Sequence, residues 1–197
     1  FWPCWSIHGK YWPAPIFFTI DSTFIEAPSS TKNQEKERDS EAHSAKKGNV
    51  WHFGYKAHIG VDSESGLVHT VQVTAANVHD VCVTADLLTG EEEQVYGDSG
   101  YLGAEKRPEA RKKIRYKINR RPSQSKNNSA RSQAQIKRRE HEKSSVRAKV
   151  EHVFAVLKLQ LRYRKTRYRG LQKQTAKVNI LLALANLILA DRPGLTA

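Results

Sequence analysis

The sequence has no methionine, only two cysteines and no apolar run long enough to cross a membrane. Cys4 and Cys82 are too few for a disulfide scaffold or a four-ligand zinc knuckle. The longest apolar run, 180–190, contains Asn186 and is shorter than the roughly 20 residues that a membrane helix needs. Three prolines and the lack of a basic start also exclude a signal peptide in the first twenty residues. We therefore expect a soluble protein of a reducing compartment.

The missing methionine also bears on the beginning of the chain. A translated product normally starts with Met, whereas this sequence of 197 residues starts with Phe1. We therefore expect a fragment of a longer gene rather than a processed product. The length suits one compact domain, and 39% hydrophobic residues are enough to bury a core.

Positive charge is concentrated in the second half of the chain. Lys and Arg number 33 against 20 Asp and Glu, which gives a net charge of +13. Residues 106–143 hold 15 Lys and Arg against three acids, and residues 158–173 hold seven with no acid. Such clustering predicts a polyanionic partner, most commonly nucleic acid. A solvated basic surface is the alternative.

Local patterns predict a mixed α/β domain. Period-two or β-rich segments predict strands at 16–25, 51–61, 67–75, 94–96 and 114–118. Helices are expected at about 80–88, with Asp80 as its cap, at 104–113, along an apolar stripe from Val150 to Leu161, and from about Thr175 onward. The polar segments 28–49 and 119–136 are expected to be loops.

Two of these elements carry further expectations. In 51–61, apolar residues alternate with polar ones, which predicts one apolar face and leaves Lys56 and His58 on a polar, solvent-exposed face. In the last helix, apolar residues cover nearly the whole circumference, so we expect it to be largely buried.

Three carboxylates stand out by their position. Asp21 interrupts an apolar strand, Asp98 follows another strand and Glu151 borders the apolar stripe of a helix. An acid among apolar residues is costly unless something compensates it, and a hard divalent cation such as Mg²⁺ would compensate all three. For Glu151 an ordinary surface pair with Arg147, one turn away, is an equally open interpretation.

Several ordered blocks of sequence resemble the IS5-type transposases of the IS4-like superfamily. The resemblance runs from about Ile20 to Arg192 and ends in an Arg-x3-Glu-x6-Lys signature. Its blocks are Asp21-Ser22-Thr23, Glu26 to Asn33, Lys46 to Asn49, Trp51 to Asp62, Ala76 to Asp80, Gly97 to Tyr101, and Arg147 to His152 with Lys158.

This resemblance implies a ribonuclease-H-like mixed sheet flanked by helices, carrying a DDE triad. Mapped by motif, Asp21, Asp98 and Glu151 would be the catalytic residues and would hold two Mg²⁺ or Mn²⁺ ions. The family's reaction is metal-dependent DNA cleavage and strand transfer, with double-stranded transposon ends and target DNA as partners. It further implies a bacterial cytoplasmic protein associated with DNA, and it leaves a homodimer on DNA open. The predicted DNA-contacting residues are Arg147, Lys158, Lys56, His58, Arg162, Arg164, Arg167 and Arg169.

The chain departs from the family pattern in two places. Ser144 stands where the wider signature has Tyr, and only twenty residues precede Asp21, so we expect an N-terminally truncated copy. We divide the chain into an atypical segment 1–19, a catalytic domain 20–192 and a tail 193–197. The alternatives are a catalytically inactive, DNA-binding remnant of a transposase and a non-catalytic nucleic-acid-binding protein. A zinc enzyme is disfavoured because no His pair has i,i+4 spacing around a Glu.

Overall fold

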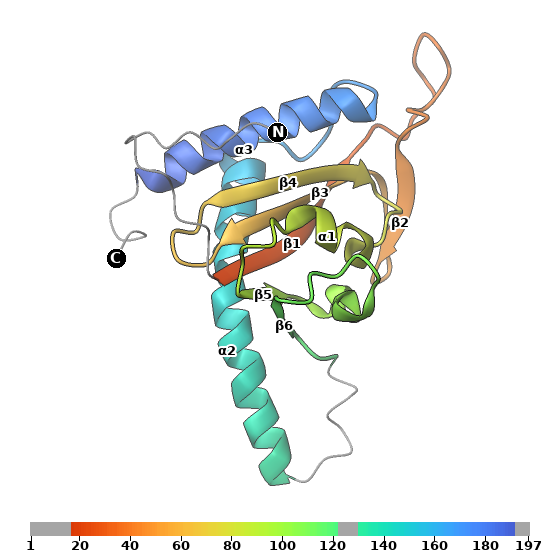
Figure 1. The fold of residues 1–197 in the computed structure, drawn as a ribbon. Coiled ribbons are helices and arrows are strands. Elements are labelled where there is room, and N and C mark those ends of the chain that lie inside the picture. Colours follow the sequence, from red (N-terminus) through yellow and green to blue (C-terminus); the bar gives the residue numbers. More distant parts are fainter. Residues whose placement is uncertain (1–16, 122–129, 192–197) are drawn as a thin grey trace.

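A computed structural model describes residues 17–121 and 130–191 of the chain. Six strands form one sheet in the order β2-β3-β1-β5-β6, with β4 also paired to β3 (Figure 1). The strands are β1 Phe17–Glu26, β2 His43–Lys47, β3 Val50–Asp62, β4 Val68–Ala75, β5 Gln94–Gly97 and β6 Arg115–Ile118. The helices are α1 Thr84–Leu87, α2 Ala130–Ala155 and α3 Leu171–Ala190; 3-10 turns lie at Asp80–Val83, Ser99–Tyr101 and Ala104–Lys106, and a π-helix at Val156–Gln160.

The strand directions are mixed. β3 is antiparallel to both β1 and β4, while β5 runs parallel to β1 and β6 parallel to β5. The sheet curls into a half-barrel with helices against it, and α2 extends well beyond its edge (Figure 1). This architecture confirms the predicted α/β, ribonuclease-H-like fold class.

The long strand β3 is the centre of the antiparallel half. Gly54 pairs with Glu26 of β1 and with His43 of β2, so these two strands lie on opposite edges of β3. A Cβ atom at Gly54 would stand 2.2 Å from the Ile25 carbonyl oxygen, and the backbone has φ of +151° there. Only glycine therefore allows β1 and β3 to approach so closely. The prediction of an uninterrupted loop over 28–49 is wrong, because β2 lies within it.

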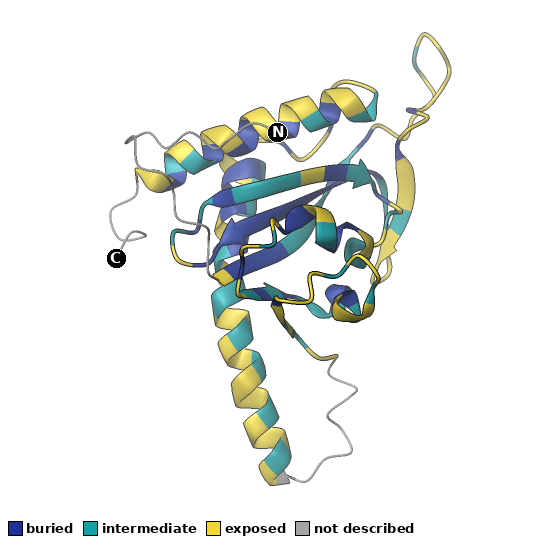
Figure 2. Cartoon of the chain, viewed as in Figure 1, coloured by how far each residue is buried: buried dark blue, intermediate teal, exposed yellow. Residues whose placement is uncertain are grey.

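Two apolar clusters lie on the two faces of the sheet. Much of the central strands is accordingly coloured as buried in Figure 2. Ile25 and Ile59 belong to the cluster that packs under α2 and α3. Phe18 and Ile20 belong to the other cluster, which also contains Tyr101. Both faces of the central strands are thus buried. The expected single apolar face of 51–61 is confirmed, since Tyr55, Ala57, Ile59 and Val61 all lie in the cluster under α2 and α3, but the opposite, polar face is also buried from Gly54 onward.

The helices differ from the sequence prediction in extent and in burial. Only Ala104–Lys106 of the helix expected at 104–113 forms, as a 3-10 turn, and α2 begins inside the loop expected at 119–136. The last helix is not largely buried: Ile180, Leu184 and Leu187 remain 42–60% exposed, because α3 packs on the sheet along one side only. The helix predicted at about 80–88 forms as a 3-10 turn followed by α1.

Parts of the predicted domain division lie outside the described residues, namely 1–16 of the N-terminal segment and the whole tail 193–197. The same holds for 122–129 of the expected loop. In the part of the chain that is described, no helix is long and apolar enough to cross a membrane.

Candidate active site

The two aspartates lie side by side because of strand register. In the parallel pair β1–β5, each residue from Phe17 to Thr19 faces a partner 77 positions further along the chain. The same interval separates Asp21 from Asp98. The paired register ends at Thr19 with Tyr96. Asp98 directly follows β5 with extended backbone angles, φ of −77° and ψ of 179°, which continue the direction of the strand, and its charge raises the pKa of Asp21, so the two carboxylates lie close together. Partners in register project to the same face of a sheet. Here that is the face covered by α2, because Arg147 of α2 contacts Asp21.

Each aspartate accepts a hydrogen bond from a backbone N–H that closely follows it in the chain. Asp21 Oδ1 accepts from the Ser22 N–H at 2.7 Å, and Asp98 Oδ1 accepts from the Gly100 N–H at 2.7 Å. The Arg147 guanidinium lies 3.5 Å from Asp21 Oδ2. Burial and, to a smaller extent, the Asp98 charge raise the pKa of Asp21, against the lowering effects of the Ser22 N–H and Arg147. The pair therefore carries negative charge that Arg147 alone does not compensate.

The aspartates lie at a gap in the sheet. β5 ends at Gly97, whereas β1 continues to Glu26. Beyond the gap, the Glu26 N–H donates to the Arg164 carbonyl at 3.0 Å, and the Glu26 carbonyl accepts from the Thr166 N–H at 2.7 Å. Between these points, no strand among the described residues pairs with that edge of β1. Asp21 thus stands where the edge of β1 becomes accessible.

A buried polar network lies behind the turn that follows Asp98. Lys56 Nζ donates to the Val78 carbonyl at 2.8 Å and to Asp80 Oδ1 at 2.9 Å. Asp80 caps no helix, since His79 is the N-cap residue of its 3-10 turn. The nearby Tyr101 side chain is fully buried, and its pKa is raised by burial and by Asp80, Asp21 and Asp98. The charges of all three aspartates therefore act on the Tyr101 hydroxyl.

His58 joins the same network. Its side chain is completely buried, with Nε2 at 2.9 Å from Thr74 Oγ1 and Nδ1 at 3.7 Å from Asp80 Oδ1. Burial lowers the pKa of His58 to about 4, although Asp80 opposes the shift. The expected solvent exposure of Lys56 and His58 is wrong, because the 3-10 turn and α1 cover their face of the sheet. Such burial does not favour the predicted DNA contacts of these two residues.

Glu151 is placed differently from the aspartates. It lies on α2 one helical turn after Arg147, and its side chain is exposed to solvent. Across residues 17–121 and 130–191, no three His, Cys, Asp or Glu side chains lie close enough together to hold a metal ion. The structure thus brings Asp21 and Asp98 together but leaves Glu151 apart. The two aspartates nevertheless fit a hard divalent cation, since they offer paired carboxylate oxygens with uncompensated charge.

Lys158 lies on the π-helix that follows α2. The predicted continuous α-helix to Leu161 is wrong, because the chain changes to π geometry at Val156 and the Leu161 N–H donates to the Val156 carbonyl. Burial, followed by the charges of Lys47 and Arg164, lowers the pKa of Lys158. Cations that repel one another in this way form a ready site for an anion such as phosphate. Sequence reasoning did not include Lys47 in this group.

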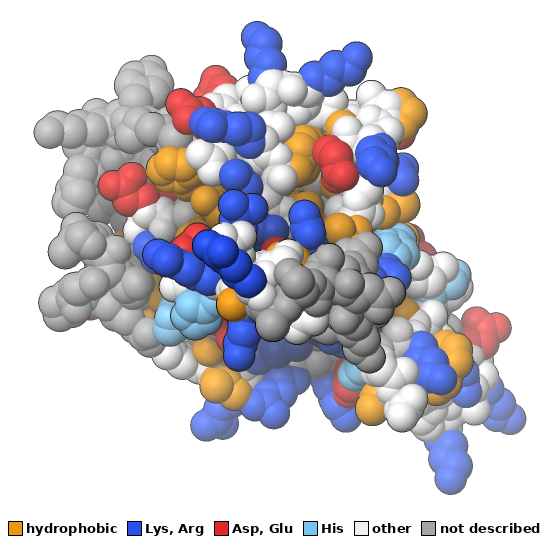
Figure 3. Space-filling view, turned by 90° about the horizontal axis from the view of Figure 1, so that it is seen from below, with side chains coloured by type: hydrophobic (Ala, Val, Ile, Leu, Met, Phe, Trp, Pro, Cys, Tyr) orange, Lys and Arg blue, Asp and Glu red, His pale blue; other side chains and the backbone are white. Residues whose placement is uncertain are grey.

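The predicted arginine run is on the surface. Arg162, Arg164, Arg167 and Arg169 are all exposed. Arg169 forms an ion pair with Glu35 and donates to the Glu37 carbonyl at 2.9 Å, which ties this run to the segment before β2. Seen from below, Lys and Arg side chains are spread widely over the molecule, with few acids among them (Figure 3). This distribution suits a polyanion.

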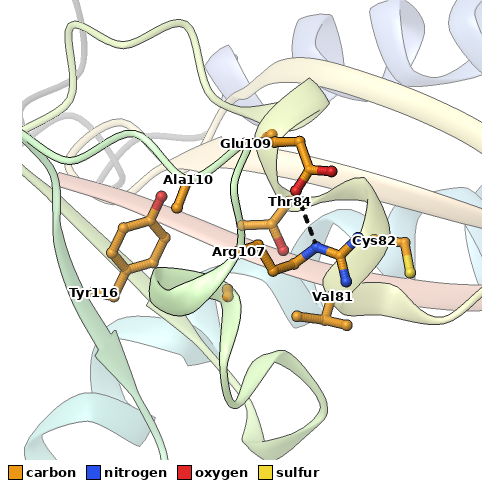
Figure 4. A pocket seen from close by; sticks show the side chains of 9 residues that line it. Val81, Cys82, Thr84, Arg107, Glu109, Ala110 and Tyr116 are labelled. Carbon is orange, nitrogen blue, oxygen red and sulfur yellow. Dashed lines mark ion pairs between the residues drawn. The ribbon is translucent and has the colours of Figure 1, made fainter.

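A separate shallow pocket lies between the 3-10 turn at Asp80–Val83 and the segment before β6. Figure 4 shows its lining, including Cys82, Tyr116 and the ion pair of Arg107 with Glu109, whose atoms are 3.4 Å apart. None of the three predicted acids lines it. The pocket is therefore distinct from the candidate active site.

Sequence reasoning missed Asp80, which it treated as a helix cap. The signal that could have drawn attention to it is the block Ala76 to Asp80, which belongs to the family resemblance but was given no role.

A known protein family matches this chain. A family model described as "Transposase DDE domain" matches residues 12–187, which is most of the chain. No solved structure matches the chain significantly.

Proposed function

Because the chain belongs to the transposase DDE domain family, we propose that it is an IS5-type transposase that cleaves DNA and transfers the cut strand. The observation that carries this proposal is the coincidence of two independent features. The strand register sets Asp21 beside Asp98, and Arg147 of the Arg-x3-Glu-x6-Lys signature lies 3.5 Å from Asp21. Glu151 is one turn from that contact, so a side-chain rotation would carry it toward the aspartates.

In this proposal Asp21, Asp98 and Glu151 hold two Mg²⁺ or Mn²⁺ ions. When bound, such ions would activate a water or a DNA 3′-hydroxyl and stabilise the leaving oxygen. Asp21 would be the central residue of the three, because Arg147 of α2 contacts it on one side and the Asp98 charge acts on it from the other. On metal and DNA binding, Arg147 would release Asp21 and turn to a flanking phosphate. Its charge would thus offset Asp21 in the free protein and a DNA phosphate in the complex.

The test is a plasmid-nicking assay with Mg²⁺ or Mn²⁺ and with a chelator. We expect nicking by the parent chain only with metal, and a loss of about a hundredfold or more in Glu151→Gln, because an amide cannot replace the carboxylate charge. Glu142→Gln is the matched control: Glu142 is an exposed acid on the same helix, paired with Arg138 at 3.3 Å. Equal nicking by parent and Glu151→Gln would remove Glu151 from the mechanism. DNA binding without nicking would favour the inactive remnant.

The basic surface gives a second test of the same function. Phosphate contacts position DNA without reading its sequence, so we expect affinity that falls steeply with salt and depends weakly on sequence. Replacing Arg162, Arg164, Arg167 and Arg169 by Gln should flatten the plot of log affinity against log salt by about 0.9 per lost contact. Lys32→Gln, at an exposed position outside both basic tracts, serves as the control. An unchanged slope in the fourfold variant would mean that this run does not contact phosphate.

A further inference from the structure

A fourth carboxylate lies next to the paired aspartates. If Gly100 had a Cβ atom, it would stand 2.9 Å from Asp98 Oδ1 and 3.5 Å from Asp80 Oδ2. Both carboxylates therefore converge on the same glycine, and no side chain fits between them. Because Asp80 comes from the turn after β4 and Asp98 from the end of β5, this convergence depends on the tertiary fold.

Lys56 fixes the other side of Asp80. Its side chain is only 10% exposed, and its ammonium group is held by Asp80 Oδ1, by the Val78 carbonyl and against the Phe24 ring, whose centroid is 5.3 Å away. The two Asp80 oxygens thus face opposite ways: Oδ1 faces Lys56, and Oδ2 faces the turn of Asp98. A Lys held by three groups cannot swing out to follow a mobile ligand.

We propose that the Lys56–Asp80 pair is a positioning element that sets how tightly Asp21 and Asp98 bind a divalent cation. The inference rests on the proposed function in one respect, that these two aspartates hold the cation. With both members present, the pair is neutral and supports the Gly100 turn that anchors Asp98. Removing one member leaves an unpaired charge in a poorly solvated place next to the site, and the sign of that charge depends on which member is lost.

This arrangement predicts shifts of opposite sign. Asp80→Asn leaves the Lys56 cation unpaired and should weaken cation binding, whereas Lys56→Met leaves the Asp80 anion unpaired and should strengthen it. At the dielectric that describes such half-buried sites, each shift is on the order of threefold to tenfold. The double variant Lys56→Met with Asp80→Asn restores neutrality and should return to within about twofold of the parent.

The experiment is Mn²⁺ binding to the whole chain without DNA, measured by electron paramagnetic resonance of free Mn²⁺. Arg138→Met and Glu142→Gln provide the control, because this pair on α2 is 85% and 63% exposed and its charges are screened by solvent. Both controls should bind Mn²⁺ as the parent does. Lys56→Arg keeps the charge and should also match the parent. Should Asp80→Asn fail to fold, tighter Mn²⁺ binding in Lys56→Met than in Lys56→Arg still tests the sign of the effect.

If the Lys56–Asp80 pair had only a structural role, both single variants would shift the Mn²⁺ affinity in the same direction, since each would loosen the same turn. Shifts of the same sign, or no shift in either variant, would overturn the proposal, as would a parent chain that binds no Mn²⁺. The nicking assay separates the two hypotheses. Opposite shifts in a protein that does not nick DNA would uphold this inference and reject the proposed function, while nicking with shifts of the same sign would do the reverse.

Discussion

The aspartates on the sheet and the glutamate on the helix reach the candidate site by different routes. Asp21 and Asp98 are fixed by backbone pairing between β1 and β5 and need no ligand to bring them together. Glu151 depends on how α2 lies across the sheet, and the contact made there is that of Arg147 with Asp21. Strand register places a side chain by many backbone hydrogen bonds, whereas a helix face is placed by side-chain packing alone.

This difference has an electrostatic consequence. The sheet half of the site, Asp21 and Asp98, brings two carboxylates together before any cation arrives. Burial and, to a smaller extent, the Asp98 charge raise the pKa of Asp21, and Arg147 partly offsets that shift. On α2, the Glu151 carboxylate stays exposed to water, where its charge carries little desolvation cost. In a site divided in this way, the two aspartates are in place without a ligand. Glu151 joins them only in a state that a bound ligand favours.

The largest effect on stability is expected from disrupting the sheet that carries the two aspartates, at the pairing of β1 with β3. Gly54→Ala would force a Cβ atom into the backbone of β1, so we expect a loss of about 3 kcal/mol in the free energy of unfolding. Gly48→Ala is the matched control: Gly48 has φ of +60° but no atom within 4 Å of a Cβ, so about 1 kcal/mol is expected. Urea unfolding of both variants measures the difference. Equal losses would mean that the close approach of β1 and β3 does not constrain the sheet.

The sequence predicts the sheet half of the site better than its surroundings. β-rich segments mark β1, β3, β4 and β5 to within about two residues, because period-two patterns report local burial. β2 was missed because its side chains are mostly exposed and carry no apolar alternation. The register that sets Asp21 beside Asp98 depends on long-range pairing, which no local pattern encodes; the family resemblance supplied that pair.

The errors about burial share one cause. Lys56 and His58 occupy polar positions of an alternating strand, so a local pattern places them in water. The turn and helix that cover them come from residues 80–87, which reach this face only in the folded chain. The reverse error concerns α3: its apolar circumference predicts burial, but the sheet offers only one surface to pack against. Sequence periodicity shows which residues share one face of a strand or helix, but it does not show which other elements pack against that face.

A second effect, which approaches the first in size only at acid pH, is expected from protonation of His58 behind the two aspartates. Since the pKa of His58 is about 4 in the fold and 6.5 in the unfolded chain, protonation favours unfolding. Stability from this group is complete above pH 6.5 and falls as the pH drops toward 4, by up to about 3 kcal/mol. Asp80 faces the ring and moderates this loss, whereas the charge of Lys56 adds to it.

The measurement is the urea midpoint between pH 4 and pH 7.5. His58→Gln keeps a polar partner for Thr74 and should flatten the curve, whereas His141→Gln, at an exposed position on α2, should follow the parent. If His58→Gln kept the full pH dependence, the acid sensitivity would belong to another group.

The smallest effect is the most direct test of the contrast between sheet and helix. Without metal, Asp98→Asn should raise stability by about 1 kcal/mol, because it removes repulsion from Asp21 while the amide oxygen still accepts from the Gly100 N–H. That corresponds to a rise of about 2–4 °C in Tm for a domain of this size. Glu151→Gln should leave Tm unchanged, since the Glu151 side chain is exposed. With added Mn²⁺ the order of the Tm values should invert. The Tm of the parent should rise the most, because its complete set of carboxylates binds the ion most tightly. A rise in the Tm of metal-free Glu151→Gln equal to that of Asp98→Asn would show that Glu151 already lies among the aspartates, and the distinction between a prepared sheet and a mobile helix acid would fail.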